Sequence, residues 1–163
     1  MAGAKSIAAS TVTMTQLVLP SHTNSLGSIF GGTVMSWIDI CGAIAAQRHS
    51  KSEVVTASID ELHFVAPVYK GWVVNLKASV NFVAKTSMEV GVRVDAENPK
   101  TGETFHTASA YLTFVAIGSD GKPNIVPKLE LQNEEEKRRN EEARLRREHR
   151  LATRKAKALQ IQK

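Results

Sequence analysis

The sequence predicts an α+β fold in which an antiparallel sheet curls around one buried helix and a charged helix follows. Three observations support this prediction. Residues 32–47 form an apolar segment that includes several helix-forming alanines. Residues 54–117 contain four segments with strand composition, separated by turn signals. Residues 134–163 are densely charged and contain neither Gly nor Pro, as expected for a solvated helix.

The length and composition indicate a single domain. A chain of 163 residues can bury one ordinary hydrophobic core, but it is too short for two full domains and a tail. Its hydrophobic share of 42% and charged share of 23% are close to globular averages, which argues against disorder and against a disulfide scaffold. We therefore divide the chain into a flexible N-terminus (residues 1–10), a folded domain (11–131) and a charged C-terminal helix or tail (132–163).

The net charge of +5 lies in the C-terminal segment. Residues 134–163 hold 11 Lys or Arg and 6 Glu, whereas residues 1–133 hold 10 charges of each sign. The folded domain is therefore neutral, and we expect no nucleic-acid partner for it. No run of about 18 apolar residues is present, so we expect no membrane span. The single Cys41 is typical of a reducing compartment, and we expect a cytoplasmic protein.

The first elements are a strand, a loop and a helix. Residues 11–19 are rich in β-branched and apolar types and are followed by Pro20, which predicts a strand that stops there. The next ten or so residues contain Asn, Ser and Gly, and we expect a loop. Residues 32–47 are apolar on every side, and a helix of this kind is expected to be buried all round.

The later segments alternate between apolar and polar residues, as strands with one dry and one wet face do. Strands are predicted in residues 54–68, 72–85, 86–97 and 104–117. The predicted dry face carries Val74, Leu76, Ala78, Val80, Phe82, Met88, Val90, Val92 and Val94, and the wet face carries Asn75, Lys77, Ser79, Asn81, Glu89, Arg93 and Asp95.

The charged C-terminal segment predicts a helix held by pairs of side chains four residues apart. The acidic residue comes first in each pair, which is the favourable order. Too few apolar residues are present for the helix to pack a wide face. The pairs are Glu134 with Arg138, Glu135 with Arg139, and Glu142 with Arg146.

Asp39 is the only charged residue between Lys5 and Arg48, and it lies in the most apolar segment of the chain. A buried carboxylate without a partner costs several kcal/mol, so Asp39 either has a structural partner or takes part in chemistry. Its helical neighbours Ser36 and Gly42 are small and leave room for a ligand.

The loop before the helix contains residues suited to hold a carbonyl oxygen. Asn24 offers an amide, and Gly31 and Gly32 let backbone amides at a helix start approach a ligand closely. With Asp39 as a base for water, these groups would permit hydrolytic addition to a carbonyl. On spacing alone, Asp39 could equally be a structural carboxylate and Asn24 a capping residue.

The stretch PSHTNSLGSIFGGTVMSWID resembles the signature of hotdog-fold acyl-coenzyme A thioesterases, in the acyl-CoA hydrolase subgroup. In that subgroup an Asn, a Phe-Gly-Gly turn, a Met, a Trp and an Asp recur at this spacing. The segments FVAPV, KTSMEVGVRV and EEEKRR are similar too, so the resemblance covers about residues 13–147.

The resemblance implies a hotdog fold, with a five-stranded antiparallel sheet wrapped around a long central helix. It also implies dimers with active sites at the interface, often assembled into trimers of dimers. The family pair is Asn and Asp from opposite subunits, which here are Asn24 and Asp39. By resemblance, Asp39 activates water or attacks the thioester, and Asn24 polarises the carbonyl or positions water. The expected substrate is acyl-CoA, with coenzyme A as its leaving moiety and no cofactor or metal.

The coenzyme A phosphates require Lys, Arg or backbone amides, its adenine requires an apolar slot, and its pantetheine arm would occupy a tunnel. Candidates for the first role are Lys85, Thr86, Ser87 and Arg93, all in the segment that resembles the family's TSMEV strand. Phe64 and Val65 are candidates for the tunnel. Each of these residues could instead be an ordinary surface or core residue.

Two other functions fit the same fold. A non-catalytic module that binds or senses acyl-CoA would keep the pocket without turnover, although no helix-turn-helix pattern accompanies the sheet. Hydratase chemistry usually requires a His a few residues after the Asp, but the next His after Asp39 is His49. Hydrolysis of acyl-CoA is therefore the function that the sequence favours.

Overall fold

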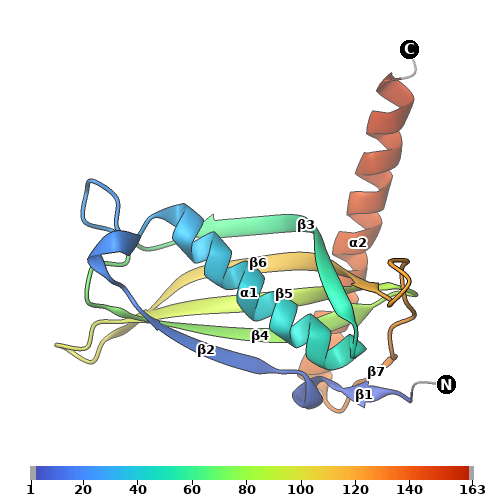
Figure 1. The fold of residues 1–163 in the computed structure, drawn as a ribbon, viewed down its shortest axis with the longest axis horizontal. Coiled ribbons are helices and arrows are strands. Elements are labelled where there is room, and N and C mark those ends of the chain that lie inside the picture. Colours follow the sequence, from blue (N-terminus) through green and yellow to red (C-terminus); the bar gives the residue numbers. More distant parts are fainter. Residues whose placement is uncertain (1–2, 162–163) are drawn as a thin grey trace.

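The computed structural model describes residues 3–161, and it has the predicted fold class (Figure 1). A five-stranded sheet packs on one long helix, and a second helix follows the sheet. The elements are β1 (Lys5–Ser6), β2 (Val12–Leu17), α1 (Gly31–Ser50), β3 (Glu53–Phe64), β4 (Val73–Val83), β5 (Ser87–Glu97), β6 (Thr104–Ile117), β7 (Leu129–Glu130) and α2 (Glu134–Ile161), with short 3-10 turns at Ile7–Ala9 and Pro20–His22.

The sheet has the strand order β2-β4-β5-β6-β3, and every neighbouring pair is antiparallel. β3 and β2 are therefore its two edge strands. Between the sheet and α1 lies the hydrophobic core, to which β4, β5 and β6 contribute the alternate residues expected from the sequence. The fully buried members include Val74, Leu76, Val90, Val94 and Leu112. The predicted alternation is thus confirmed for most of the sheet.

The N-terminal residues are held to the fold, whereas the sequence predicts a flexible segment over residues 1–10. Lys5 and Ser6 pair in parallel with Leu129 and Glu130, and the side chain of Ile7 is buried. Main-chain hydrogen bonds and one apolar anchor therefore fix residues 5–7. Residues 1 and 2, together with 162 and 163 of the predicted tail, lie outside the described residues.

Helix α1 buries only one side in a single protomer, although its composition predicts burial all round. Its inner side is lined by small and apolar residues, and Gly42 packs so closely that an added Cβ would lie 3.1 Å from the Phe114 ring. Met35 and Ile40 on the outer side remain 41% and 48% exposed. The prediction is therefore wrong for the isolated chain, because five strands cover one side of the helix only.

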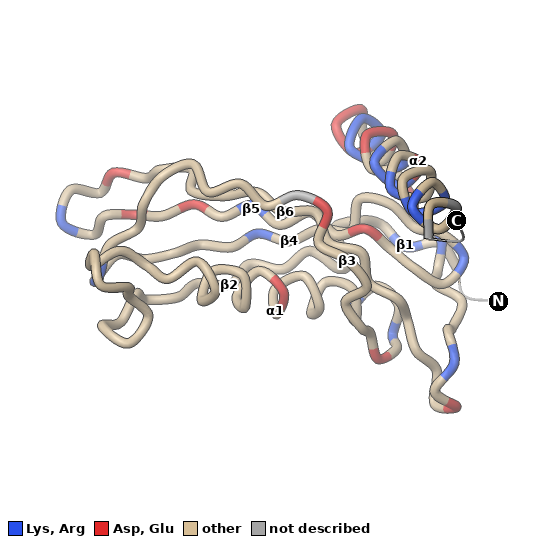
Figure 2. The backbone as a smooth tube through the Cα atoms, turned by 90° about the horizontal axis from the view of Figure 1, so that it is seen from above, with Lys and Arg blue, Asp and Glu red and all other residues tan. Residues whose placement is uncertain are grey.

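Helix α2 docks on the outer face of the sheet, opposite α1, through a narrow polar contact. Ala143 is fully buried there, and Asn140 Nδ2 donates a 2.8 Å hydrogen bond to the carbonyl of Asn81. Arg146 forms a 2.8 Å ion pair with Glu89, and its guanidinium lies 3.7 Å from the centre of the Tyr111 ring. Figure 2 shows that charged residues gather along α2, whereas α1 carries one acidic residue in its middle.

This docking corrects three details of the predicted pattern. Glu89 is buried beneath α2, whereas the sequence predicts that it faces solvent. Arg146 forms an ion pair with Glu89, and not with Glu142 as predicted. A register shift between Val80 and Phe82 interrupts β4, so that Asn81 is buried beneath α2 and Phe82 is only half-buried. Of the predicted helical pairs, Glu135 with Arg139 is confirmed at 2.8 Å. Glu134 and Arg138 do not pair with each other: Glu134 pairs with Lys137, and Arg138 pairs with Glu135.

Within residues 3–161, neither helix is long and apolar enough to cross a membrane. The cytoplasmic location stays a prediction.

Candidate active site

Asp39 lies in the middle of α1 on its half-buried flank, next to edge strand β3. Thr56 on β3 donates a hydrogen bond of 2.6 Å from its hydroxyl to Oδ1 of Asp39. Oδ2 of the same carboxylate has no hydrogen-bond donor among the described residues. One carboxylate oxygen is therefore held in place while the other is available, and the group remains accessible because Asp39 is only half-buried.

Asn24 organises the loop that precedes α1. Its side-chain Oδ1 accepts a 2.9 Å hydrogen bond from the amide of Leu26, and its Nδ2 donates to the Ser28 hydroxyl at 3.1 Å. Gly27 closes the turn with a φ of +77°, which only glycine adopts easily. Within the described chain no hydrogen bond joins Asn24 to Asp39, so a single protomer does not link the predicted pair.

The start of α1 has unpaired backbone amides. The residue before the helix, Phe30, provides no side-chain cap, so the first amides, those of Gly31 and Gly32, have no acceptor among the described residues. An added Cβ at Gly32 would lie 2.4 Å from the Phe30 ring, so a side chain there would require the exposed Phe30 ring to move. These amides can therefore donate hydrogen bonds to an anionic oxygen.

An open pocket of about 330 Å³ adjoins this helix start. Gly31, Phe64 and Val65 line it, so the structure brings the predicted tunnel residues next to the predicted oxyanion amides. Phe64 and Val65 are 51% and 67% exposed, so the pocket has an open apolar wall. Such exposure fits a surface that a ligand or a second chain covers.

The other predicted coenzyme A contacts lie elsewhere in the protomer. On β6, Ser87 pairs with Val115 whereas Phe64 pairs with Ala108, so the turn with Lys85, Thr86 and Ser87 lies at the opposite end of the sheet from the pocket. Arg93 projects from the outer face of β5, away from α1, where it pairs with Asp95 at 3.0 Å. One protomer therefore does not bring these four residues to Asp39.

Sequence reasoning missed Thr56. Threonine is a common strand residue, and nothing in the composition of residues 54–68 distinguishes it from its neighbours. Its importance appears only when β3 and α1 lie side by side, because 17 residues separate it from Asp39 along the chain.

Cys41 is unsuited to nucleophilic chemistry. The thiol is fully buried, and this burial raises its pKa to about 11. A structural role for Cys41 agrees with the sequence-based interpretation. Among the side chains that the structure describes, no cluster of three or more His, Cys, Asp or Glu is placed to hold a metal ion.

Comparison with known proteins identifies relatives over most of the chain. Residues 26–103 match the family described as the Thioesterase superfamily. An uncharacterized acyl-CoA thioester hydrolase of Bacillus subtilis is 43% identical over 78% of this chain and 74% of its own length.

Solved structures resemble the fold closely. The crystal structure of an apo hexameric acyl-CoA thioesterase is 44% identical, with a TM-score of 0.89 over 93% of this chain and 97% of that one. An acyl-CoA hydrolase from Staphylococcus aureus, in complex with butyryl coenzyme A, coenzyme A and coenzyme A disulfide, is 35% identical, with a TM-score of 0.89 over 97% and 96% of the two chains. Further structures of that enzyme carry Ala in place of one Asn, one Asp or one Thr.

Proposed function

The chain belongs to the thioesterase superfamily as an acyl-CoA thioester hydrolase, and we propose that Asp39, Thr56 and Asn24 of a partner subunit carry its reaction. The products are a free carboxylic acid and coenzyme A. The observation that carries the proposal is the 2.6 Å hydrogen bond from Thr56, which holds one oxygen of Asp39 and leaves the other free on an accessible flank of α1.

The spacing of the three residues supports this assignment. The Staphylococcus aureus variants replace an Asn, an Asp and a Thr that are separated by 15 and then 17 residues. Asn24, Asp39 and Thr56 have the same two separations. This agreement extends the proposed site from the two residues found by sequence to a third one.

In the proposed reaction, Asp39 activates a water molecule or attacks the thioester carbonyl itself. The carbonyl oxygen gains negative charge, which the Asn24 amide and the unpaired amides of Gly31 and Gly32 stabilise. Thr56 keeps the carboxylate oriented by donating to Oδ1, so that Oδ2 faces the reacting atom. The bond from the carbonyl carbon to the coenzyme A sulfur then breaks, and the sulfur leaves as the thiol with the proton that Asp39 took from water. If Asp39 attacks directly, water supplies that proton and hydrolyses the acyl-aspartate anhydride to release the acid.

A partner subunit is part of the proposal because the protomer leaves the site incomplete. The exposed flank of α1 carries Met35 and Ile40, and the neighbouring edge strand exposes Val55 and Ile59. An apolar surface beside an unpaired strand edge favours association with a second copy. One structural relative is named as hexameric, which supports a trimer of dimers for this chain.

The pocket of about 330 Å³ beside Gly31 is the proposed tunnel for the pantetheine arm, with Phe64 and Val65 on its wall. Lys85, Thr86, Ser87 and Arg93 stay proposed contacts for the coenzyme A phosphates. Because they lie far from this pocket within one chain, they could serve this role only from a neighbouring subunit.

The test is thiol release from a panel of acyl-CoAs with short to long chains, measured with a thiol reagent. We expect turnover by the wild type and a loss of at least ~10²-fold in Asp39→Asn, the lower end for removal of a general base. Circular dichroism and unfolding of that variant control for folding. Binding of acyl-CoA without thiol release would instead favour the alternative function, a module that senses acyl-CoA.

A further inference from the structure

A second hydrogen-bonded group of side chains lies on the outer face of the sheet, on the side away from α1. His106 Nδ1 lies 3.2 Å from Oδ1 of Asp95, and the Ser109 hydroxyl lies 3.2 Å from Nε2 of the same ring. Each ring nitrogen thus faces one partner, in the order hydroxyl, imidazole, carboxylate. This order is the one that nucleophilic serine chemistry requires.

An irregularity in the pairing of β5 with β6 brings these side chains to one face. Residues three apart in a regular strand point to opposite faces. Here Arg93 pairs with Ser109 and Asp95 pairs with His106. Between these two pairs β6 contains one more residue than β5 does, which makes a bulge. Thr107 is buried and lines the pocket on the α1 side, which leaves His106 and Ser109 together on the outer face. Bulges that redirect side chains in this way are frequent next to active sites.

The charges around His106 suit a proton relay. The Asp95 side chain is 16% exposed, and Arg93 donates to it from Nε at 3.0 Å. Burial acts to raise the pKa of the Asp95 carboxyl, but the hydrogen bonds from Arg93 and His106 outweigh burial and lower this pKa below its usual value. Asp95 therefore remains ionised at neutral pH, where it can orient His106 and stabilise the imidazolium form.

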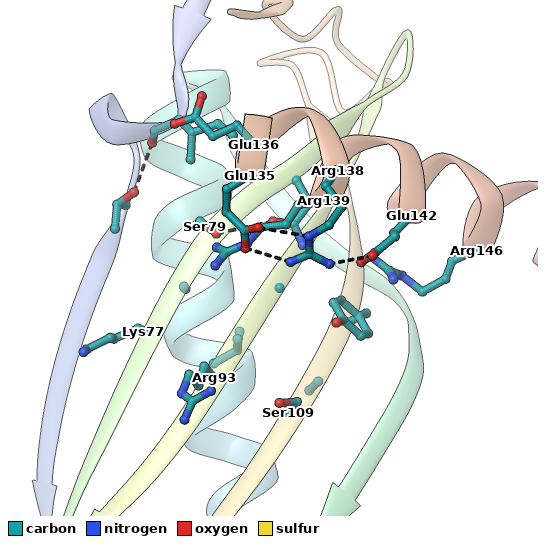
Figure 3. Close-up of a pocket in the computed structure, with 18 of the residues that line it drawn as sticks. Lys77, Ser79, Arg93, Ser109, Glu135, Glu136, Arg138, Arg139, Glu142 and Arg146 are labelled. Atoms are coloured by element: carbon teal, nitrogen blue, oxygen red, sulfur yellow. Dashed lines mark hydrogen bonds and ion pairs between the residues drawn. The ribbon is translucent and has the colours of Figure 1, made fainter. Parts of the chain in front are cut away.

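Ser109 faces an open cavity of about 720 Å³ between the sheet and the first half of α2 (Figure 3). Ser79 and Gly91 form part of the floor, and an added Cβ at Gly91 would lie 2.5 Å from Nδ2 of Asn81. In Figure 3, Arg93 and Ser109 lie together in the part of the cavity away from α2. Ser109 is half-buried and lines the cavity, and its cross-strand neighbour Arg93 supplies a guanidinium that can stabilise an oxyanion.

We propose that Ser109 is a nucleophile toward small carboxylic esters, at a site separate from Asp39. The Ser109 oxygen bonds to the ester carbonyl carbon while its proton passes to Nε2 of His106. The bond from that carbon to the leaving alcohol oxygen breaks, and His106 returns the proton to the alcohol. A water molecule then hydrolyses the acyl-serine ester by the same proton path. Arg93 stabilises the oxyanion, and Asp95 is a positioning residue for His106.

The experiment uses the full-length protein with Asp39→Asn, in order to silence the thioester site. A fluorophosphonate probe reports a nucleophilic serine, and mass spectrometry of the peptides locates the label. We expect one label per chain at Ser109, and a burst of p-nitrophenol when p-nitrophenyl acetate is added. Ser109→Ala should abolish both signals, and His106→Gln should slow labelling by at least ~10²-fold.

Ser79→Ala is the matched control, because Ser79 lines the same cavity but donates its hydrogen bond to Asn81 at 3.3 Å rather than to a histidine. It should label as fast as the parent. Thermal unfolding checks that each variant is folded. Absence of label at Ser109 in folded protein would overturn the proposal. Labelling that is equally fast in His106→Gln would overturn the relay.

Discussion

Thr56 on edge strand β3 donates its hydroxyl to Asp39 in the middle of α1, and their oxygens lie 2.6 Å apart. The hydrogen bond connects the helix to the strand at a flank where the apolar side chains of Met35, Ile40 and Val55 are exposed. It therefore fixes the carboxylate at a surface that a second subunit is expected to cover.

Replacement of Thr56 by Val tests this relationship, because Val has nearly the same shape and lacks the hydroxyl. Loss of a hydrogen bond to a charged group costs about 1.5 kcal/mol, so we expect acyl-CoA turnover to fall roughly 10-fold. Thr56→Ser keeps the donor and should stay close to the wild type. Turnover by Thr56→Val equal to that of the wild type would remove Thr56 from the site. Steady-state thiol release measures all three proteins.

The sequence predicts those features of the fold that depend on neighbouring residues. The alternation of Val74, Leu76 and Ala78 places them all against α1, because side chains alternate along a strand whatever lies beyond it. The motif from Asn24 to Asp39 likewise identifies a loop and helix start that the structure presents next to a pocket.

Features that depend on distant partners could not be predicted. Glu89 looks like a solvated strand residue, and only Arg146, 57 residues later, explains its burial. The outward flank of α1 looks like core because a single sequence does not distinguish burial within one chain from burial between chains. The bulge at Thr107 could not be predicted either. Nothing in the sequence of residues 104–117 indicates which residue of β6 has no pairing partner on β5.

The buried pair of Glu89 and Arg146 should contribute strongly to the docking of α2. The Glu89 side chain is 2% exposed, and its replacement leaves the partly buried Arg146 guanidinium, 19% exposed, without its ion-pair partner. We expect Glu89→Gln to lower the free energy of unfolding by about 3 kcal/mol, as for other broken buried pairs. Glu134→Gln is the control, because its pair with Lys137 is exposed and should contribute below about 1 kcal/mol. Urea unfolding at one protomer concentration compares the two, and equal losses would contradict the prediction.

His49 should make stability depend on pH. The ring is fully buried, and Nε2 lies 2.9 Å from the carbonyl oxygen of Pro127. Burial lowers the pKa of His49 below 6.5; the Pro127 hydrogen bond opposes this shift, and the charge of Lys5 adds to it. As pH falls below about 6.5, the unfolded chain takes up a proton that the folded chain refuses, so the free energy of unfolding decreases.

The slope from this one group reaches at most about 1.4 kcal/mol per pH unit, between the unfolded pKa and the lower folded pKa. Urea unfolding at pH 7.5 and pH 5.5 measures it. His49→Gln should flatten the dependence, whereas His149→Gln, on the exposed side of α2, should leave it unchanged. Equal pH dependence in the wild type and His49→Gln would assign the effect to other groups.

If Asn24 and Asp39 act across subunits, two inactive variants should complement each other. A dimer of one Asn24→Ala chain and one Asp39→Asn chain has one site with both native residues and one site with neither. Random pairing makes about half of all dimers mixed, so coexpression should recover about a quarter of wild-type turnover. Coexpression of two differently tagged Asn24→Ala chains is the control and should recover none. Mixed dimers can be purified through different tags on the two chains. If they showed no turnover, Asn24 and Asp39 would have to act from the same chain, in a site formed within one protomer.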